Sequence, residues 1–211
     1  MSQIVKGYSF DEESMIKIRN VRVYDFDESI EASKFPKTVN PDSVSSAITD
    51  MAVKLAQCKP GTGHDNYLQG IRVAFTMDIT VKALVEAERY HFLDIISSTS
   101  TMHKLIDFNF DECYCKYVDK RAVSVMHELL DEYNAMDDND PAKEEKMLSL
   151  LYTNPCGFTY TIRFTTDYRQ LKTIYIQRHD HHIPEWREFC SKFIEKLPHS
   201  ELITGRRVKS A

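Results

Sequence analysis

Apolar residues alternate with polar ones in three stretches of the chain, and this period of two predicts β-strands. The stretches are Met15 to Phe26, Ile71 to Met77 and Phe158 to Phe164. Between the first strand and Asn40, the turn residues Phe35-Pro36-Lys37 indicate an irregular segment. The strand from Ile71 has one face suited to burial, as in a sheet with one covered face.

Apolar residues at helical spacing predict six helices. Their residue ranges are 41–59, 80–91, 120–136, 142–152, 168–178 and 184–197. An oxygen-bearing side chain at a helix start accepts hydrogen bonds from first-turn amides, so Asp167 or Thr166 is expected to cap the fifth helix. The acidic break at 137–141 separates the third and fourth helices, and we interpret this pair of helices as an insertion.

Composition favours one globular domain of mixed architecture. The chain has 211 residues, of which 42% are hydrophobic and 28% charged, close to globular averages. A chain of this length buries most of its apolar side chains in a core. We therefore expect one α/β (α+β) domain over residues 1–200, with a central sheet flanked by helices. A short basic tail with Arg206, Arg207 and Lys209 is expected at 201–211.

Charge, hydropathy and cysteine content indicate which partners, which compartment and which cysteine redox state to expect. A formal net charge of -5 gives no electrostatic reason to expect nucleic acid as a partner. No basic leader precedes an apolar segment, and no apolar run approaches the length of a membrane span. We therefore expect a cytoplasmic protein that does not contact a membrane. An odd number of scattered cysteines predicts reduced thiols, at Cys58, Cys113, Cys115, Cys156 and Cys190.

Three short clusters carry candidate chemistry. The hydroxyl-rich stretch Ser97 to Thr101 suits a nucleotide phosphate, because hydroxyls and loop amides donate hydrogen bonds to phosphate oxygens. In the alternative interpretation, these side chains hydrogen-bond to their own backbone. His179-Asp180-His181-His182 has residue types that bind zinc or iron, but adjacent residues rarely converge on one ion, so no metal site is expected. Pro155-Cys156 offers a nucleophilic thiol, although a small buried thiol after a turn is the interpretation that we favour.

Two segments resemble the flavin-dependent thymidylate synthases. The run TDYRQLKTIYIQRHDHHIPEWREFC, from Thr166 to Cys190, is similar to the C-terminal signature of that family, with Asp167, Arg178 and His182 at its Asn, Arg and His. The run VEAERYHFLDIISSTSTMHK falls where the family has RHRxxSxxxxSxR. Together the two segments cover about a quarter of the chain, in the order and separation of the family.

The second segment departs from the family motif at most positions. Anchoring on His91 puts Ser100 on the final serine of the motif. The motif arginines then fall on Tyr90, Phe92 and Met102, while its first serine falls on Ile95. The STMH element and the RHDHHIPEWREFC tail look more like short phage-encoded relatives than like standard bacterial enzymes, which implies the cytoplasm of a bacterial or phage-infected cell. Four other cations are candidates to replace the motif arginines: Arg89, Lys104, Arg163 and Arg169.

The resemblance implies the fold of that family and an enzyme that uses FAD. Such an enzyme transfers a one-carbon unit to ring carbon five of a pyrimidine deoxynucleotide monophosphate of the dUMP type, as a methyl or hydroxymethyl group. NADPH and methylenetetrahydrofolate are the co-substrates that the resemblance implies, and the flavin sites lie between the subunits of a homotetramer. The alternative is a non-catalytic nucleotide-binding or regulatory homologue with the same fold.

The resemblance also implies roles for individual residues. Arg178 is the candidate catalytic residue, because a cation beside a ring carbonyl stabilises enolate-like charge; the alternative is a solvated arginine favoured by the helix C-terminus. Flavin contacts fall on His91, Asp167, Thr173 and His182, and nucleotide contacts fall on Ser98, Ser100, Thr101, Met102, His103 and Arg178.

Overall fold

A computed structural model describes residues 3–5 and 13–205 of the chain. Within those residues, an antiparallel sheet runs in the order β1-β2-β3-β5-β4. The strands are β1 (Gln3–Ile4), β2 (Lys17–Tyr24), β3 (Arg72–Thr80), β4 (Asp94–Ser98) and β5 (Thr159–Asp167). β3 and β5 pair along their whole length, with Arg72 opposite Asp167 and Thr80 opposite Thr159. This central pair fixes the positions of the flanking elements.

Four of the described helices, α2, α3, α5 and α7, begin at a residue whose side chain accepts from a first-turn amide. They are α1 (Phe26–Ala32), α2 (Asp50–Ala56), α3 (Val81–Ala87), α4 (Thr101–Lys104), α5 (Lys120–Ala135), α6 (Lys143–Thr153), α7 (Tyr168–Arg178), α8 (Pro184–Glu188) and α9 (Glu201–Thr204). Thr80 caps α3 by accepting from the Ala83 amide, and Asp167 caps α7 by accepting from the Gln170 amide. Both caps sit at strand ends, so each strand passes directly into its helix.

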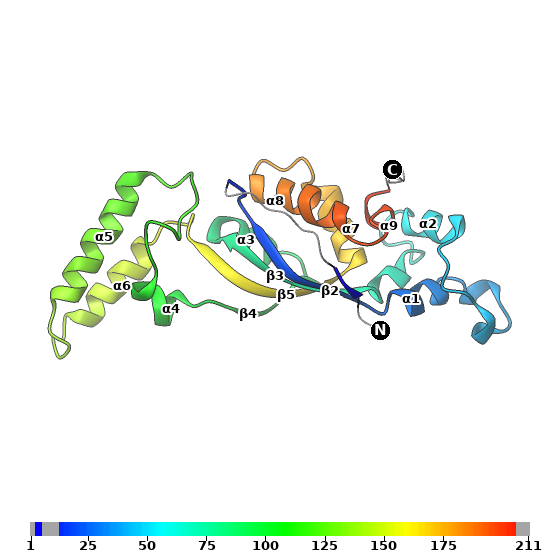
Figure 1. Cartoon of the computed structure of the whole chain (residues 1–211), viewed down its shortest axis with the longest axis horizontal. Helices are drawn as coiled ribbons and strands as arrows, with labels where there is room; N and C mark the ends of the chain where they lie inside the picture. The colour runs from blue at the N-terminus through cyan, green and yellow to red at the C-terminus, as the bar shows by residue number, and fades with distance from the viewer. Residues whose placement is uncertain (1–2, 6–12, 206–211) are drawn as a thin grey trace.

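One face of the sheet is covered and carries the main core. Figure 1 shows α3, α7 and α8 over that face. The buried residues Val73, Phe75 and Met77 of β3 point into this layer, and they alternate with the partly exposed Arg72 and Thr76. The alternation arises because successive strand residues point to opposite faces. The other face of the sheet is therefore polar.

The helices α5 and α6 form a hairpin that projects from one end of the sheet (Figure 1). The hairpin base has its own cluster of buried residues, which includes Phe110, Met126, Leu150 and Phe158. Phe158 directly precedes β5, so this small core is joined to the main sheet through one strand. The predicted pair of helices at 120–136 and 142–152 is confirmed, as is their acidic connection.

Most of the predicted elements are confirmed. The strands expected from Met15, Ile71 and Phe158 are β2, β3 and β5. The fifth predicted helix is α7, with the bounds that its periodicity gave and with Asp167 as the cap. These elements have strong local patterns, and the tertiary structure did not override them.

The predicted helix 41–59 is wrong over its first half. Pro41–Ser43 form only a 3-10 turn, and the helix proper, α2, begins at Asp50 after the cap Thr49. The Lys34 ammonium donates to the carbonyls of Ser45 and Ala47, the latter at 2.7 Å. Those carbonyls are therefore not used for intrahelical bonds, and the segment before Thr49 stays extended.

The last predicted helix also needs correction. The predicted helix 184–197 is α8 followed by a π-helical turn at Phe189–Phe193 and a 3-10 turn at Ile194–Lys196. The wide π turn lets Phe189 and Phe193 both contact the Phe75 ring, with centroids 5.8 Å and 4.7 Å from it.

The expected tail at 201–211 begins with a packed helix. Leu202 and Ile203 of α9 are 0% and 1% exposed and belong to the main core. The packed structure therefore continues beyond the expected boundary at residue 200. Arg206, Arg207 and Lys209 lie outside the described residues.

Candidate functional site

The segment around His91 lies against α7, so the two segments that carry the family resemblance are in contact. The Tyr90 hydroxyl donates to Gln177 Oε1 at 3.1 Å, and the Phe92 amide donates to Gln170 Oε1 at 3.3 Å. The Thr166 hydroxyl donates to the Phe92 carbonyl at 2.7 Å. These bonds join positions about 80 residues apart in sequence, and periodicity alone gives no sign of them.

Arg178 lies at the centre of a buried network at the end of α7. Its side chain is 10% exposed, so the alternative of a solvated helix-end arginine is wrong. Nε donates to the Tyr90 hydroxyl at 2.6 Å, Nη2 donates to Glu86 Oε2 at 2.8 Å, and Nη1 contacts His181 Nε2. The guanidinium carbon lies 5.5 Å from the Tyr90 ring centroid and 5.3 Å from that of Trp186. Both distances suit cation–π contacts.

The charge of Arg178 is compensated within the chain. Its hydrogen bond holds the pKa of Glu86 below the ordinary value, so the carboxylate stays ionised. Burial raises the pKa of the Tyr90 phenol, so the hydroxyl stays protonated and donates to Gln177. A ligand oxygen that reaches Arg178 must therefore compete with Glu86 for the guanidinium.

The four residues from His179 to His182 do not converge on one point. His179 stacks on Tyr175, with ring centroids 5.4 Å apart, and its Nε2 lies 2.9 Å from Asp180 Oδ2. His181 contacts Arg178, and His182 is exposed. Among the described residues, no group of three or more His, Cys, Asp or Glu side chains is arranged to hold a metal ion. The motif is therefore a helix end whose members have separate roles.

The environment of His181 predicts a loss of stability in mild acid. Burial, and then the charge of Arg178, lower the pKa of His181 from 6.5, and Nε2 lies against the guanidinium of Arg178, from which only a ring nitrogen without a proton accepts. As the pH falls, the unfolded chain therefore takes up a proton on this histidine before the folded chain does. The contribution of neutral His181 to the free energy of unfolding is complete above pH 6.5, and it declines as the pH falls toward the lower pKa of the folded state. We expect a lower urea midpoint at about pH 5 than at about pH 7.5.

The variant His181→Asn should reduce this difference, because an amide oxygen accepts from Arg178 without titrating. His64→Asn is the control, since His64 is exposed. An unchanged pH dependence in His181→Asn would show that other groups cause the decline.

The hydroxyl-rich stretch is not the expected loop. Its first part is the edge strand β4, whose five residues are all exposed, and its last part enters the short helix α4. The strand was missed because Asp-Ile-Ile-Ser-Ser does not alternate, and only pairing with β5 makes it extended. This pairing puts Ser97 opposite Arg163.

The hydroxyls of this stretch divide into engaged and open groups. Thr99 Oγ1 accepts from the Thr161 amide at 3.2 Å, and Thr101 Oγ1 lies 2.9 Å from the Tyr160 hydroxyl. Thr99 thus satisfies the backbone of the neighbouring strand β5 and not that of its own segment. The hydroxyls of Ser97, Ser98 and Ser100 have no hydrogen-bond partner within the described parts of the chain. These three remain available to a ligand.

The other predicted contacts lie in different surroundings. Met102 is 64% exposed and His103 is also exposed, while the His91 ring lies beside Phe92 with centroids 4.7 Å apart. None of the hydrogen bonds, ion pairs or ring contacts among the described residues joins 98–103 to Arg178. The two predicted parts of the nucleotide site therefore do not touch each other directly.

Asp167 and Thr173 are engaged on α7. Asp167 is 2% exposed, and its oxygens accept from the Gln170 amide at 2.8 Å and from Arg72 Nη1 at 3.3 Å. Burial raises the pKa of this carboxyl group. Thr173 Oγ1 donates back to the Arg169 carbonyl at 3.2 Å. The structural role of Asp167 is to begin α7 and to hold Arg72.

Of the four candidate replacement cations, Arg163 is the one that lies beside the hydroxyl strand. Its Nη1 donates to the Asn20 carbonyl at 2.9 Å, on the polar face of the sheet. The others form ion pairs: Arg169 with Asp65, Arg89 with Glu86, and Lys104 with Asp107. The Nη1 of Arg163 also donates to Thr76 Oγ1 at 3.3 Å, and both acceptors are neutral. Among the described residues, Arg163 therefore has no ion-pair partner.

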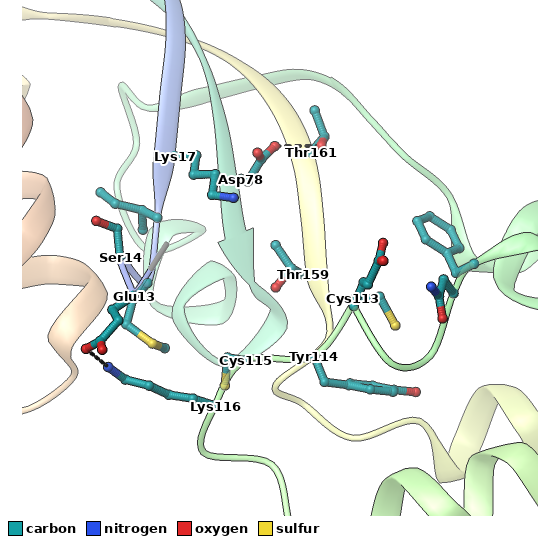
Figure 2. A pocket seen from close by; sticks show the side chains of 15 residues that line it. Glu13, Ser14, Lys17, Asp78, Cys113, Tyr114, Cys115, Lys116, Thr159 and Thr161 are labelled. Atoms are coloured by element: carbon teal, nitrogen blue, oxygen red, sulfur yellow. Dashed lines mark hydrogen bonds and ion pairs between the residues drawn. The ribbon is translucent and has the colours of Figure 1, made fainter. Parts of the chain in front are cut away.

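A polar cavity of about 420 Å³ opens at the end of β2, β3 and β5 nearest the hairpin. Figure 2 shows Lys17, Asp78 and Thr161 along one side of it. Thr161 donates to Asp78 at 2.6 Å, and its backbone pairs with Thr99, so the cavity adjoins the hydroxyl strand. The sequence analysis missed these residues. Their shared face follows from strand pairing, for which the sequence has no local signal.

No family model matches the sequence, and no curated protein matches it. Solved structures do match. A crystal structure of thymidylate synthase X from Helicobacter pylori with FAD and dUMP has a TM-score of 0.64 at 12% identity, over 90% of this chain and 95% of that one. A second Helicobacter pylori structure with the same ligands has a TM-score of 0.61 at 12% identity, over 86% and 94%. The chain has the fold of a flavin-dependent thymidylate synthase.

The thymidylate synthase X fold confirms the predicted mixed α/β class and the single domain. It extends over nearly the whole of both chains, whereas the sequence resemblance covered about a quarter. No helix in the described ranges is long and apolar enough to span a bilayer. All five cysteines are free thiols. Cys156 is exposed, so the expectation of a buried thiol is wrong, because the turn at 155–157 brings it to the surface.

Proposed function

We propose that this protein is a flavin-dependent enzyme that transfers a one-carbon unit to carbon five of a pyrimidine deoxynucleotide monophosphate. The observation that carries the proposal is the fold match, because both similar structures contain FAD and dUMP. Contact between the segments around His91 and Arg178 adds support, since both resemble signatures of that family. The product is a methylated or hydroxymethylated nucleotide.

Exposed residues before and along β4 fit a planar cofactor. Phe92, Ile95 and Ile96 are 47%, 41% and 59% exposed, and His91 lies beside Phe92. Aromatic and aliphatic surfaces of this kind stack on flat ring systems. We propose that His91 and Phe92 hold FAD. Once reduced, bound flavin would supply the electrons that the transfer requires.

The remaining predicted cofactor contacts are assigned by resemblance. Thr173 and His182 stay predictions, while Asp167 is expected to act indirectly by holding α7 and Arg72. NADPH as the reductant of the flavin and methylenetetrahydrofolate as the one-carbon donor are parts of the same proposal.

The nucleotide phosphate is proposed to bind along this segment, at the open hydroxyls of Ser98 and Ser100. A dianionic phosphate requires cations or several donors, and Arg163 of the neighbouring strand, which is paired opposite Ser97, is the candidate cation. Thr101, Met102 and His103 continue along α4 and are proposed to complete the contact. Arg178 is proposed to stabilise negative charge on the pyrimidine ring.

A homotetramer with shared sites is part of the same proposal, and it comes from the resemblance. Among the described residues, no hydrogen bond, ion pair or ring contact joins Ser100 to Arg178, which is compatible with a site built from two chains. β4 is an edge strand with exposed Ile95 and Ile96, and such edges are commonly covered by another chain. Sedimentation is expected to give a tetramer, and a strict monomer would exclude shared sites.

A second candidate is a nucleotide-binding homologue without catalysis. Two observations favour it: Glu86 neutralises Arg178, and a buried Tyr90 stands at a motif arginine. This candidate predicts bound nucleotide and no turnover, so a product assay separates it from the enzyme.

The proposed function predicts that the purified protein binds flavin. Added FAD should show the visible absorption band of bound flavin, and dUMP should perturb that band. Ser100→Ala should weaken dUMP binding because it removes an open donor, whereas Ser124→Ala on α5 should not, since that hydroxyl bonds its own helix. With NADPH and methylenetetrahydrofolate, mass spectrometry should detect a modified nucleotide. A protein that ignores both FAD and dUMP would exclude the enzyme and the nucleotide-binding homologue.

A further inference from the structure

A second cavity, of about 580 Å³, lies between the start of α8 and the loops at 115–119 and 155–157. It shares Met15 and Cys115 with the polar cavity of Figure 2, but most of its walls are different. Its volume is within the range of about 300–1,000 Å³ that is typical of small-molecule sites. Neither Arg178 nor any residue of β4 lines it. The proposed flavin and nucleotide contacts do not use this space, apart from His182.

A buried carboxylate lines this cavity. Glu185 is 4% exposed, and its Oε1 accepts from the Thr80 hydroxyl at 2.6 Å. Within the described part of the chain, the other oxygen, Oε2, has no hydrogen-bond or ion-pair partner. Oε2 is nevertheless not fully buried, so it keeps some accessible surface. Oε2 therefore opens toward the space that Glu185 lines. A carboxylate in such surroundings is costly unless a donor meets it.

The buried walls around Glu185 are mostly apolar. Val118, Ala122, Pro155 and Ile183 line the cavity, and each is half-buried. Four exposed polar side chains line it as well: Lys82, Asp119, His182 and Arg187. Flat rings bind well between such apolar side chains, because both ring faces lose contact with water. A carboxylate that keeps free lone pairs accepts two parallel N–H bonds from the edge of such a ring.

We propose that this cavity is a second small-molecule site, which takes a flat ring bearing an amidine-type edge, with its paired N–H donors on Glu185. The ring lies between Val118 and Ala122 on one side and Pro155 and Ile183 on the other. This site does not depend on the proposed function, since it requires neither flavin nor nucleotide.

Cys156 provides a direct test, because it lines the same cavity and is the exposed cysteine of the five. The full chain is treated with iodoacetamide, and alkylation of Cys156 is followed by peptide mass spectrometry, with benzamidine as the probe. We expect labelling to slow about tenfold when benzamidine is at ten times its dissociation constant, since about one site in eleven is then free. Benzoate, a ring of the same size with a negative edge, should leave the rate unchanged.

Three variants locate the effect. Glu185→Gln should abolish protection by benzamidine, whereas Asp119→Asn should keep it, since Asp119 is a lining carboxylate that is exposed. Ala122→Phe fills the cavity without touching Glu185 and should also abolish protection, so it carries the test if Glu185→Gln does not fold. Circular dichroism monitors folding. Unprotected wild-type protein, equal protection by benzoate, or protection that survives in the folded variants would overturn the proposal.

Discussion

Replacing Asp65 with alanine is expected to lower the free energy of unfolding by about 3–5 kcal/mol, because it leaves a buried ammonium without its counter-ion. Asp65 is 0% exposed and Lys172 is 3% exposed, with Nζ 2.8 Å from Oδ2. Lys172 also donates to the Cys58 carbonyl at 2.8 Å. Arg169 Nε lies 3.2 Å from Oδ1, which is ion-pair distance without hydrogen-bond alignment. The pair with Lys172 is therefore the stronger contact.

Urea unfolding measures this loss as a change in midpoint at constant slope. The double variant Asp65→Ala with Lys172→Met should recover part of the loss, because no buried charge then remains unpaired. Asp107→Ala is the control, since it breaks an exposed ion pair with Lys104 and should change the midpoint little. If Asp65→Ala behaved like Asp107→Ala, the ion pair would not hold α7 to the 58–65 segment.

Replacing Arg178 with alanine is expected to weaken dUMP binding by about 100-fold, since removing one partner of a desolvated charge contact costs roughly that much. Arg178 is the cation proposed to face the pyrimidine ring, and its side chain is 10% exposed. Titration of dUMP against FAD-loaded protein measures the change. Arg89→Ala is the matched control, because Arg89 pairs with the same Glu86 but is 72% exposed, and it should bind normally.

Glu86→Gln distinguishes a ligand-binding Arg178 from a structural one. If a ligand oxygen replaces Glu86, removing this competing charge should strengthen dUMP binding while the protein becomes less stable. If Arg178 only holds Tyr90 and α8 in place, both Arg178→Ala and Glu86→Gln should lower stability and leave dUMP affinity unchanged. The second result would contradict the proposed catalytic role.

The sequence predicted those elements whose patterns are local and strong. β3 alternates except at the buried Ala74, and α7 begins at a carboxylate cap and ends where its helical pattern ends, so both were found near their observed bounds. The edge strand β4 was missed because it does not alternate. The start of α2 was misplaced because Lys34 takes up two backbone carbonyls. Contacts between distant residues decide both features, and a window of sequence does not contain them.

For the site, the sequence identified Arg178 and the hydroxyl stretch by resemblance, and their surroundings came from the structure. Burial and the contact with Glu86 make Arg178 a compensated cation rather than a solvated one. Pairing of β4 with β5 selects Arg163 from four candidate cations. Glu185, in contrast, carried no signal in sequence. One glutamate in an amphipathic helix has no distinguishing pattern until the fold buries it.

The sequence by itself therefore determined the class of fold, the central strands, the long helices and the position of two family-like segments. Those properties depend on periodicity, helix caps and residue types, which are local features of the sequence. Only the tertiary structure decided which side chains meet, which charges are compensated and where cavities lie. The reason is physical: burial and pairing arise between residues that are far apart in sequence, and they set the chemistry of Arg178, Asp65 and Glu185.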